Sequence, residues 1–379
     1  MKILHLTYDF PDVINPDKTS AIKNITELTR GDGDCCISLN RTTRFGRTAV
    51  KRCDNVYALQ TFGLPKGILF IHTLDRSINA VLSVGLDFGS FDLVHAHKLS
   101  FEGPIAFHLH NLYGLPCIIT IQQTDFKILK YKPLLRNYYY RILEAAQHIV
   151  LISPWMEKQL DRVFGFKRMD TLRDKLINIP LAVERECISK PHDNGRFLCV
   201  FNMRHGYIRL KNIYRVLRAI RLLKEAGTAI AMDIVGDGAA SGLVENMIKK
   251  LGVEDRVVMT GRVENSRIVE FMSDYRAFVL CSYPETFGMV YIEALSAGLP
   301  LIHSKDAGID GFFDNMGIGI AVRHDSIGEI CRAFCEIDKN AGRFRENVQG
   351  LQNSGVLRQF SDESVREKYV SIYGSVVEQ

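Results

Sequence analysis

Two glutamates bracket a short apolar stretch in the run CSYPETFGMVYIEALSAGLPLI, residues 281–302. Glu285 follows an expected strand, and Glu293 lies inside a helix expected to begin near Phe287–Gly288. On a helical path the two carboxylates are about 80° apart, on a similar face. A glycine at 288 allows a close approach of the backbone, and the free N–H groups of a first helical turn bind anions. The pattern predicts that the two carboxylates accept hydrogen bonds from sugar and ribose hydroxyls beside a phosphate site. In the alternative interpretation, Glu285 caps the helix and Glu293 is a surface residue.

The elements that must position these residues are short, nearly continuous apolar runs that alternate with helical patterns. Such runs are typical of parallel strands covered on both faces, and the alternation indicates βαβ units. The helix after residue 288 is expected to stop at Gly298 and Pro300. The expected strands are Lys2–Leu6, Leu93–His95, Cys117–Ile121, His148–Ile152, Leu176–Ile179, Phe197–Asn202, Ala229–Val235, Arg256–Thr260, Ala277–Cys281, Leu301–His303 and Gly319–Val322.

Length and composition set the class of protein. The chain has 379 residues, 46% of them hydrophobic and 24% charged, which predicts an ordinary globular protein of about two domains. The polar segment Glu184–Gly195 separates two halves that each open on a strand, so each half is expected to be a Rossmann-type domain. Nine cysteines, an odd number without a CxxC pair, indicate a reduced, cytosolic protein. Neither a signal peptide nor a membrane span is expected, because the apolar stretch at residues 1–6 and the later apolar runs are too short.

Charge is concentrated in one segment, residues 125–141 (DFKILKYKPLLRNYYYR). Five Lys or Arg stand against one Asp and are interleaved with four Tyr. One interpretation is a solvated helix face with tyrosines packed beneath it. The other is a patch that docks on anionic lipid headgroups. The net charge of +5 for the whole chain is too mild to indicate nucleic-acid binding.

The acidic motif belongs to a series of motifs whose order resembles that of family 4 glycosyltransferases. DIVGDG (233–238) and VVMTGRV (257–263) precede it, and GIGIAV (317–322) follows it. The resemblance implies a retaining, metal-independent enzyme of the GT-B fold: two facing Rossmann-like domains with a cleft between them. Residues 1–190, rejoined by a C-terminal helix at 361–379, would bind the acceptor, and residues 191–360 would bind the nucleotide sugar.

The same resemblance implies roles for matching residues. A basic pair after the first strand of the second domain would hold the donor diphosphate; here the pair is Arg204 and Lys211, with Arg209 as another candidate for the second cation. Glu285 would contact the transferred sugar and Glu293 the ribose, and we expect Glu285, Arg204 and Lys211 to be the catalytic residues. Further donor contacts are implied for Phe287, Gly288, Met289, Val290, Arg262, Val263 and Gly236. The alternative for the basic pair is a solvated loop.

The N-terminal half departs from the family pattern. The stretch Asp9–Ser20 contains no glycine where the family often has a Gly-Gly loop, which leaves Lys18, Thr19 and Ser20 as substitutes. Gln122 stands where the family often has a histidine; it can bind a sugar hydroxyl but cannot transfer a proton. His97, in the order His-Ala-His at 95–97, is a second candidate for substrate binding. Zinc is not expected, because His95 and His97 lack a third ligand at suitable spacing.

These observations lead to one hypothesis and two alternatives. The first is a hexosyltransferase-like enzyme that moves a sugar from UDP- or GDP-sugar to a glycan acceptor. The acceptor would be lipid-linked, in surface polysaccharide synthesis at the inner face of the plasma membrane. No cofactor, metal or nucleic acid is expected. The alternatives are a nucleotide-sugar epimerase or hydrolase of the same fold, and a catalytically weak module that binds sugar nucleotides or membranes.

Overall fold

The structure is a computed structural model that describes residues 1–44, 49–64, 68–188 and 191–377. It divides into two compact units. Unit 1 comprises Met1–Ile152, Met156–Ala182 and Asp362–Gln379, and unit 2 comprises Ser153–Trp155 and Val183–Ser361. Ser189 and Lys190, within the expected boundary, lie outside the described residues, as do the last two residues of the expected C-terminal helix. In the described part of the chain, no helix is long and apolar enough to span a bilayer.

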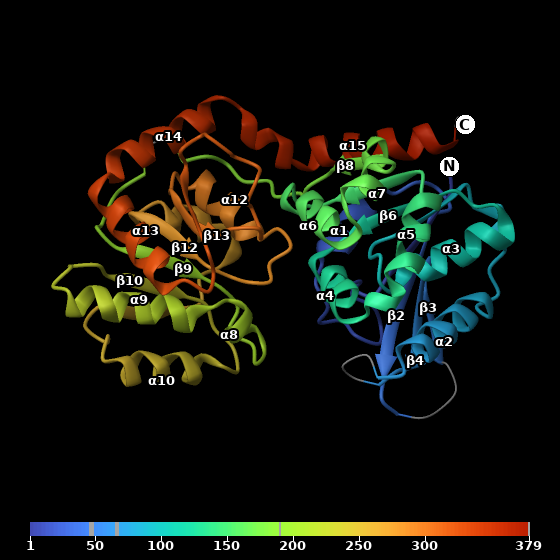
Figure 1. The fold of residues 1–379 in the computed structure, drawn as a ribbon, viewed down its shortest axis with the longest axis horizontal. Helices are drawn as coiled ribbons and strands as arrows, with labels where there is room; N and C mark the ends of the chain where they lie inside the picture. Colours follow the sequence, from blue (N-terminus) through green and yellow to red (C-terminus); the bar gives the residue numbers. More distant parts are fainter. Residues whose placement is uncertain (45–48, 65–67, 189–190, 378–379) are drawn as a thin grey trace. The chain divides into compact units, whose positions relative to one another are not determined.

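Unit 1 is built on an eight-stranded sheet in the order β3-β4-β2-β1-β5-β6-β7-β8 (Figure 1). Only β3 is antiparallel to its neighbour, β4. The strands are β1 (Ile3–Thr7), β2 (Cys35–Thr42), β3 (Ala49–Cys53), β4 (Val56–Phe62), β5 (Leu93–Ala96), β6 (Cys117–Ile121), β7 (His148–Leu151) and β8 (Leu176–Asn178). The α-helices are α1 (Ala21–Leu28), α2 (Phe70–Leu82), α3 (Glu102–Tyr113), α4 (Gln123–Tyr131), α5 (Arg136–Ala145), α6 (Trp155–Phe164), α7 (Phe166–Asp170) and α15 (Asp362–Val377).

The C-terminal helix α15 is part of the core of unit 1. Val365, Tyr369 and Tyr373 from α15 pack with Ile22 and Ile25 from α1 against buried strand residues. In Figure 1 the red helix α15 accordingly lies with the blue and green segments of this unit. Burial of these large side chains stabilises the return of the chain to its first unit.

Unit 2 is built on a six-stranded, fully parallel sheet in the order β11-β10-β9-β12-β13-β14. Its strands are β9 (Phe197–Val200), β10 (Met232–Val235), β11 (Val257–Gly261), β12 (Ala277–Leu280), β13 (Leu301–Ser304) and β14 (Gly319–Val322). Its α-helices are α8 (Tyr207–Leu210), α9 (Ile213–Glu225), α10 (Ser241–Leu251), α11 (Ile268–Met272), α12 (Met289–Ser296), α13 (Ile327–Lys339) and α14 (Ala341–Asn353).

The strands expected from the sequence are all present, with ends shifted by at most three residues. Three further strands, β2, β3 and β4, were not predicted. Polar residues such as Asn40, Lys51 and Gln60 interrupt these strands, so the sequence does not show them as continuous apolar runs. The three strands extend one side of the sheet and end in the antiparallel pair β3–β4, whose polar residues break the apolar runs.

Candidate active site

The strand order of unit 2 reverses between β9 and β12. Strands β10 and β11 lie on one side of β9, whereas β13 and β14 lie beyond β12. In open α/β sheets, ligands bind at such a switch point, at the carboxyl ends of the strands. The segments that follow β9 and β12 there are residues 201–212 and 281–288, which carry the three expected catalytic residues Arg204, Lys211 and Glu285.

Lys211 and Glu285 meet at this switch point. Lys211 Nζ lies 2.7 Å from Glu285 Oε2, although the two residues are 74 positions apart. Ser282 Oγ donates a second hydrogen bond to the same oxygen, at 2.9 Å. The Tyr283 N–H donates to the Leu210 carbonyl at 2.8 Å, so the two segments are also joined through their backbones. The side chains of Lys211 and Glu285 are only 19% and 16% exposed, so bulk water screens their attraction incompletely.

Glu285 lies in a loop four residues before α12, so the expected helical relation to Glu293 is wrong. The chain enters α12 through Gly288, which has φ of 78°. A Cβ there would lie 2.6 Å from Tyr291 Cε2 and 3.4 Å from Glu285 Cγ. Gly288 is therefore required both by its backbone angle and by close packing beside the acidic residue. The helix ends at Ser296 and is followed by Gly298 in the left-handed region, as predicted.

Glu293 is 8% exposed and is not the surface residue of the alternative interpretation. Arg185 Nη2 donates to its Oε1 at 2.8 Å. Arg185 was not predicted as a site residue, because it lies in the segment interpreted as a domain boundary and no local pattern links it to residue 293. The pairing gives the expected ribose-binding carboxylate a fixed partner within unit 2.

A glycine turn positions the loop that carries Arg204. Gly236 and Gly238 have φ of 140° and 149°. A Cβ on Gly236 would lie 1.9 Å from the carbonyl oxygen of Phe201, and one on Gly238 would lie 2.6 Å from that of Met203. The loops after β9 and β10 thus pack backbone against backbone, which only glycine permits. The turn places Arg204 at the carboxyl edge of the sheet.

The remaining predicted donor residues differ in exposure. Arg204, Arg209 and Arg262 are exposed, and Val263, Met289 and Val290 are half-buried. Phe287 is fully buried among aromatic rings, with its ring centroid 5.6 Å from that of Phe312. The Phe287 side chain is therefore part of the core beneath the loop and is not presented to a ligand.

In unit 1 the structure corrects the roles expected for Gln122 and His97. His97 is fully buried, so its side chain is out of reach of a substrate. Gln122 is 9% exposed, and its Nε2 donates to the His97 carbonyl at 2.9 Å. Gln122 also forms a capping box with Asp125 at the start of α4. Gln122 therefore supports the carboxyl edge of the sheet with its side-chain amide, and His97 is a core residue whose Nδ1 is buried without a hydrogen-bond partner among the described residues.

Sequence reasoning missed a charged cluster at the switch point of unit 1, between β1 and β5. Lys98, which is 9% exposed, forms an ion pair with Asp9. The Tyr8 N–H donates to Glu102 Oε1 at 2.8 Å, and burial raises the pKa of Glu102 to about 8. The suggested substitute Lys18 turns inward, with Nζ 3.3 Å from Asp12 Oδ2. Lys98 and Asp9 are thus the charged pair at this edge, and Asp9, with 32% of its side chain exposed, is the more accessible of the two.

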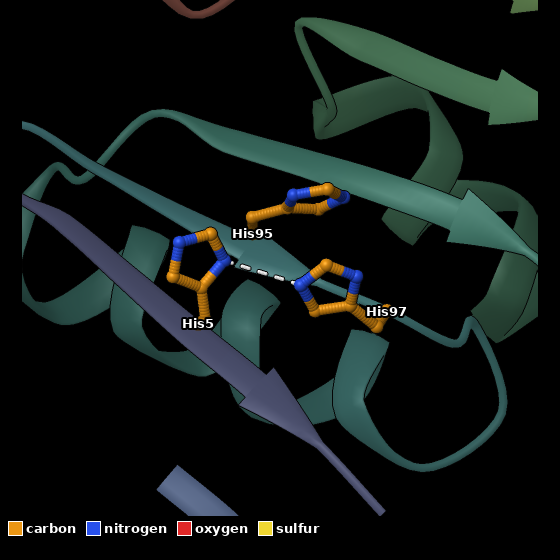
Figure 2. A group of neighbouring side chains, drawn as sticks. All are labelled: His5, His95 and His97. Atoms are coloured by element: carbon orange, nitrogen blue, oxygen red, sulfur yellow. Dashed lines mark hydrogen bonds between the residues drawn. The ribbon is translucent and has the colours of Figure 1, made fainter. Parts of the chain in front are cut away.

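A third histidine, His5, joins His95 and His97 in the core of unit 1 (Figure 2). His5 Nδ1 and His97 Nε2 are 3.1 Å apart. His95 contacts the hydroxyls of Tyr373 and Thr120, each at 2.8 Å, through its two ring nitrogens. Burial lowers the pKa of His5 to about 4 and those of the other two well below the usual value. The rings are therefore neutral, and His95 would have to give up a hydrogen bond to coordinate a metal ion.

Comparison with known proteins yields two family matches. Residues 190–349 match the family described as glycosyl transferases group 1, and residues 40–173 match glycosyltransferase family 4. Together they cover more than half of the chain. An uncharacterized glycosyltransferase of Methanocaldococcus jannaschii is 24% identical over 226 residues, which are 58% of this chain and 59% of that protein. The match thus spans less than two thirds of this relative.

Solved structures with similar folds align over almost the whole chain. Sucrose-phosphate synthase from Thermosynechococcus elongatus has a TM-score of 0.72 at 17% identity, covering 99% of each chain. HepE from Anabaena, solved in complex with UDP-glucose, has a TM-score of 0.65 at 14% identity, covering 99% of this chain and all of that one. These likenesses confirm the expected fold class, two Rossmann-like α/β units of the GT-B type.

Proposed function

The chain belongs to the group 1 glycosyl transferases of glycosyltransferase family 4, and on that premise we propose that it transfers a sugar from UDP- or GDP-sugar to a glycan acceptor with retention of configuration. The observation that carries the proposal is the Lys211–Glu285 pair at the switch point of unit 2. It places a cation and a carboxylate together where open α/β sheets bind their ligands. HepE, of the same fold, binds UDP-glucose, which supports a nucleotide-sugar donor.

The charges of unit 2 suit the departure of a nucleoside diphosphate. In the proposed reaction the bond between the anomeric carbon and the diphosphate oxygen breaks, and the diphosphate leaves with the electron pair. The acceptor hydroxyl attacks the same face of the sugar and gives its proton to the leaving phosphate. Arg204, Lys211 and the first N–H groups of α12 stabilise the developing negative charge, as preorganised donors do in other transferases. Positive charge from these groups supports the proposal that no metal is needed.

Glu285 and Glu293 supply acceptors for hydroxyl groups. In the proposal Glu285 binds the transferred sugar while Ser282 and Lys211 hold its Oε2. Glu293, held by Arg185, binds the ribose. The remaining expected donor residues contribute mainly through the backbone of the loops that follow β10, β11 and β12.

We further propose that unit 1 binds the acceptor, at the switch point that carries Lys98 and Asp9, and that the acceptor is lipid-linked, in surface polysaccharide synthesis. The site would then face the cytoplasm at the inner side of the plasma membrane. All nine cysteines are free thiols, which supports a reducing compartment.

Release of nucleotide distinguishes this reaction from its alternatives. With the donor present, we expect free UDP or GDP to appear only after a glycan acceptor is added, at a rate that saturates with acceptor. The measurement is a coupled assay for nucleoside diphosphate, with and without acceptor. Equal release without acceptor would identify a hydrolase, and conversion of the donor sugar without release would identify an epimerase. Binding of the donor without turnover, in the presence of acceptor, would favour the catalytically weak module.

A further inference from the structure

We propose that unit 1 carries a docking surface for an anionic lipid bilayer, formed by two elements that are distant in sequence. We call it the docking patch, and it consists of Lys127, Lys130, Tyr131, Lys132, Leu134, Ile68, Leu69 and Ile71. The inference rests on the proposed function in one respect: a lipid-linked acceptor would explain why the protein binds a bilayer. The patch itself is argued from exposure, contact and charge.

Large apolar side chains of the patch are unusually exposed. Leu134, in the turn between α4 and α5, is 95% exposed, and Tyr131 is 67% exposed. Ile68, Leu69 and Ile71, at the start of α2, are 55%, 56% and 57% exposed. Single exposed apolar residues are normal on protein surfaces, but a group of them indicates a binding surface.

The two groups of apolar residues adjoin each other. Lys132 Nζ lies 5.9 Å from the ring centroid of Phe70, the first residue of α2. Because Phe70 stands between Leu69 and Ile71, this contact joins the turn after α4 to the exposed start of α2. The two groups of exposed residues therefore lie on adjoining elements of unit 1, which the sequence of residues 125–141 alone did not indicate.

The charge beside the α4 part of the patch is positive, whereas α2 carries an exposed acid and an exposed base, Asp75 and Arg76. Lys127 and Lys130 are exposed on α4. The only acid in residues 125–141, Asp125, is fully buried, and its carboxylate accepts the N–H groups of Leu99 and Ser100 at 3.2 and 2.8 Å. This acid therefore does not offset the surface lysines. Exposed apolar side chains among lysines fit a bilayer with anionic headgroups.

The patch is also close to the edge where unit 1 would bind an acceptor. The Phe70 and Phe101 ring centroids are 5.1 Å apart, and those of Phe101 and Tyr8 are also 5.1 Å apart. Tyr8 in turn donates its N–H to Glu102 in the charged cluster. A row of aromatic side chains thus links the patch to the switch point between β1 and β5. A bilayer on the patch would hold lipid-linked acceptors beside that edge.

Sedimentation with vesicles tests the proposal. We expect the protein to bind vesicles of phosphatidylcholine mixed with phosphatidylglycerol, and to bind pure phosphatidylcholine much less. Each of Lys127→Gln and Lys130→Gln should lower the partition coefficient about fivefold at low salt. Leu134→Ser combined with Tyr131→Ser should lower it as well, because the apolar side chains enter the interface. Added salt should weaken binding of the wild-type protein.

A matched control is available on α10 of unit 2. Leu243, Lys249 and Lys250 are exposed there, and the triple variant Leu243→Ser, Lys249→Gln, Lys250→Gln should bind vesicles as the wild-type protein does. Absence of binding to anionic vesicles, or equal binding by patch variants and wild type, would overturn the proposal. Patch variants should still release nucleotide at the wild-type rate with a short, lipid-free acceptor. Failure of that reaction in the wild-type protein itself would instead count against the proposed function.

Discussion

Replacing Glu285 by glutamine should lower kcat for acceptor-dependent nucleotide release at least about 100-fold. The carboxylate is the partner of Lys211 Nζ at 2.7 Å and, in the proposed reaction, the ligand of the transferred sugar. Glutamine keeps the size of the side chain but loses the charge that holds the lysine. Both the sugar and the cation beside the diphosphate would then be misplaced. Initial rates at saturating donor and acceptor measure the effect.

Glu270→Gln is the matched control for this variant. Glu270 is exposed on α11 of the same unit, so its replacement should leave kcat unchanged. Thermal unfolding of Glu285→Gln should stay close to that of the wild type, which separates loss of catalysis from loss of fold. A rate within about fivefold of wild type would remove Glu285 from the catalytic residues, because a charge acting on the transferred sugar is worth more than that.

Lys211→Met should lower kcat about 100- to 1000-fold, and Arg204→Met should act in the same direction. Both cations would stabilise charge that develops on the leaving diphosphate, so the loss appears in turnover as well as in donor affinity. Lys211 is held by Glu285, and Arg204 is placed by the glycine turn at Gly236. Steady-state kinetics with varied donor separates the two effects.

A double variant tests whether Lys211 and Glu285 act as one unit in catalysis. Because Lys211 and Glu285 act through one contact, the double variant Lys211→Met, Glu285→Gln should be far less impaired than the product of the single effects. Lys250→Met, an exposed change on α10, serves as the control and should be neutral. Strictly multiplicative losses would contradict the idea that the pair works as a unit.

The sequence was sufficient to predict eleven of the fourteen strands of the described residues, because buried parallel strands are continuous apolar runs. It failed at β2, β3 and β4, where residues such as Arg52 and Gln60 interrupt the apolar runs near the end of the sheet. No short-range pattern separates such strands from polar loops. Hydrogen bonding to neighbouring strands decides their structure.

The site was predictable where its motifs are local and was missed where partners are distant. The Glu285–Glu293 motif and the glycine turn are visible in consecutive residues, and the resemblance supplied Lys211. Arg185, in contrast, reaches Glu293 across 108 positions, and the pairing of Lys98 with Asp9 depends on β1 and β5 being neighbours. The burial of His97 likewise depends on a residue distant in sequence, because the ring of His5 on β1 packs against it.

Thermal stabilisation by nucleotides, measured in EDTA, tests the central claim that unit 2 binds a nucleotide-sugar donor without metal. The panel consists of UDP-, GDP-, ADP- and CDP-sugars and the free nucleotides. A ligand at about 100 times its dissociation constant adds about 2.7 kcal/mol to the free energy of unfolding. We predict such a shift for the uridine or the guanosine series, and a smaller one in Lys211→Met at the same concentration. No shift with any nucleotide, at concentrations that saturate turnover of related enzymes, would contradict the account.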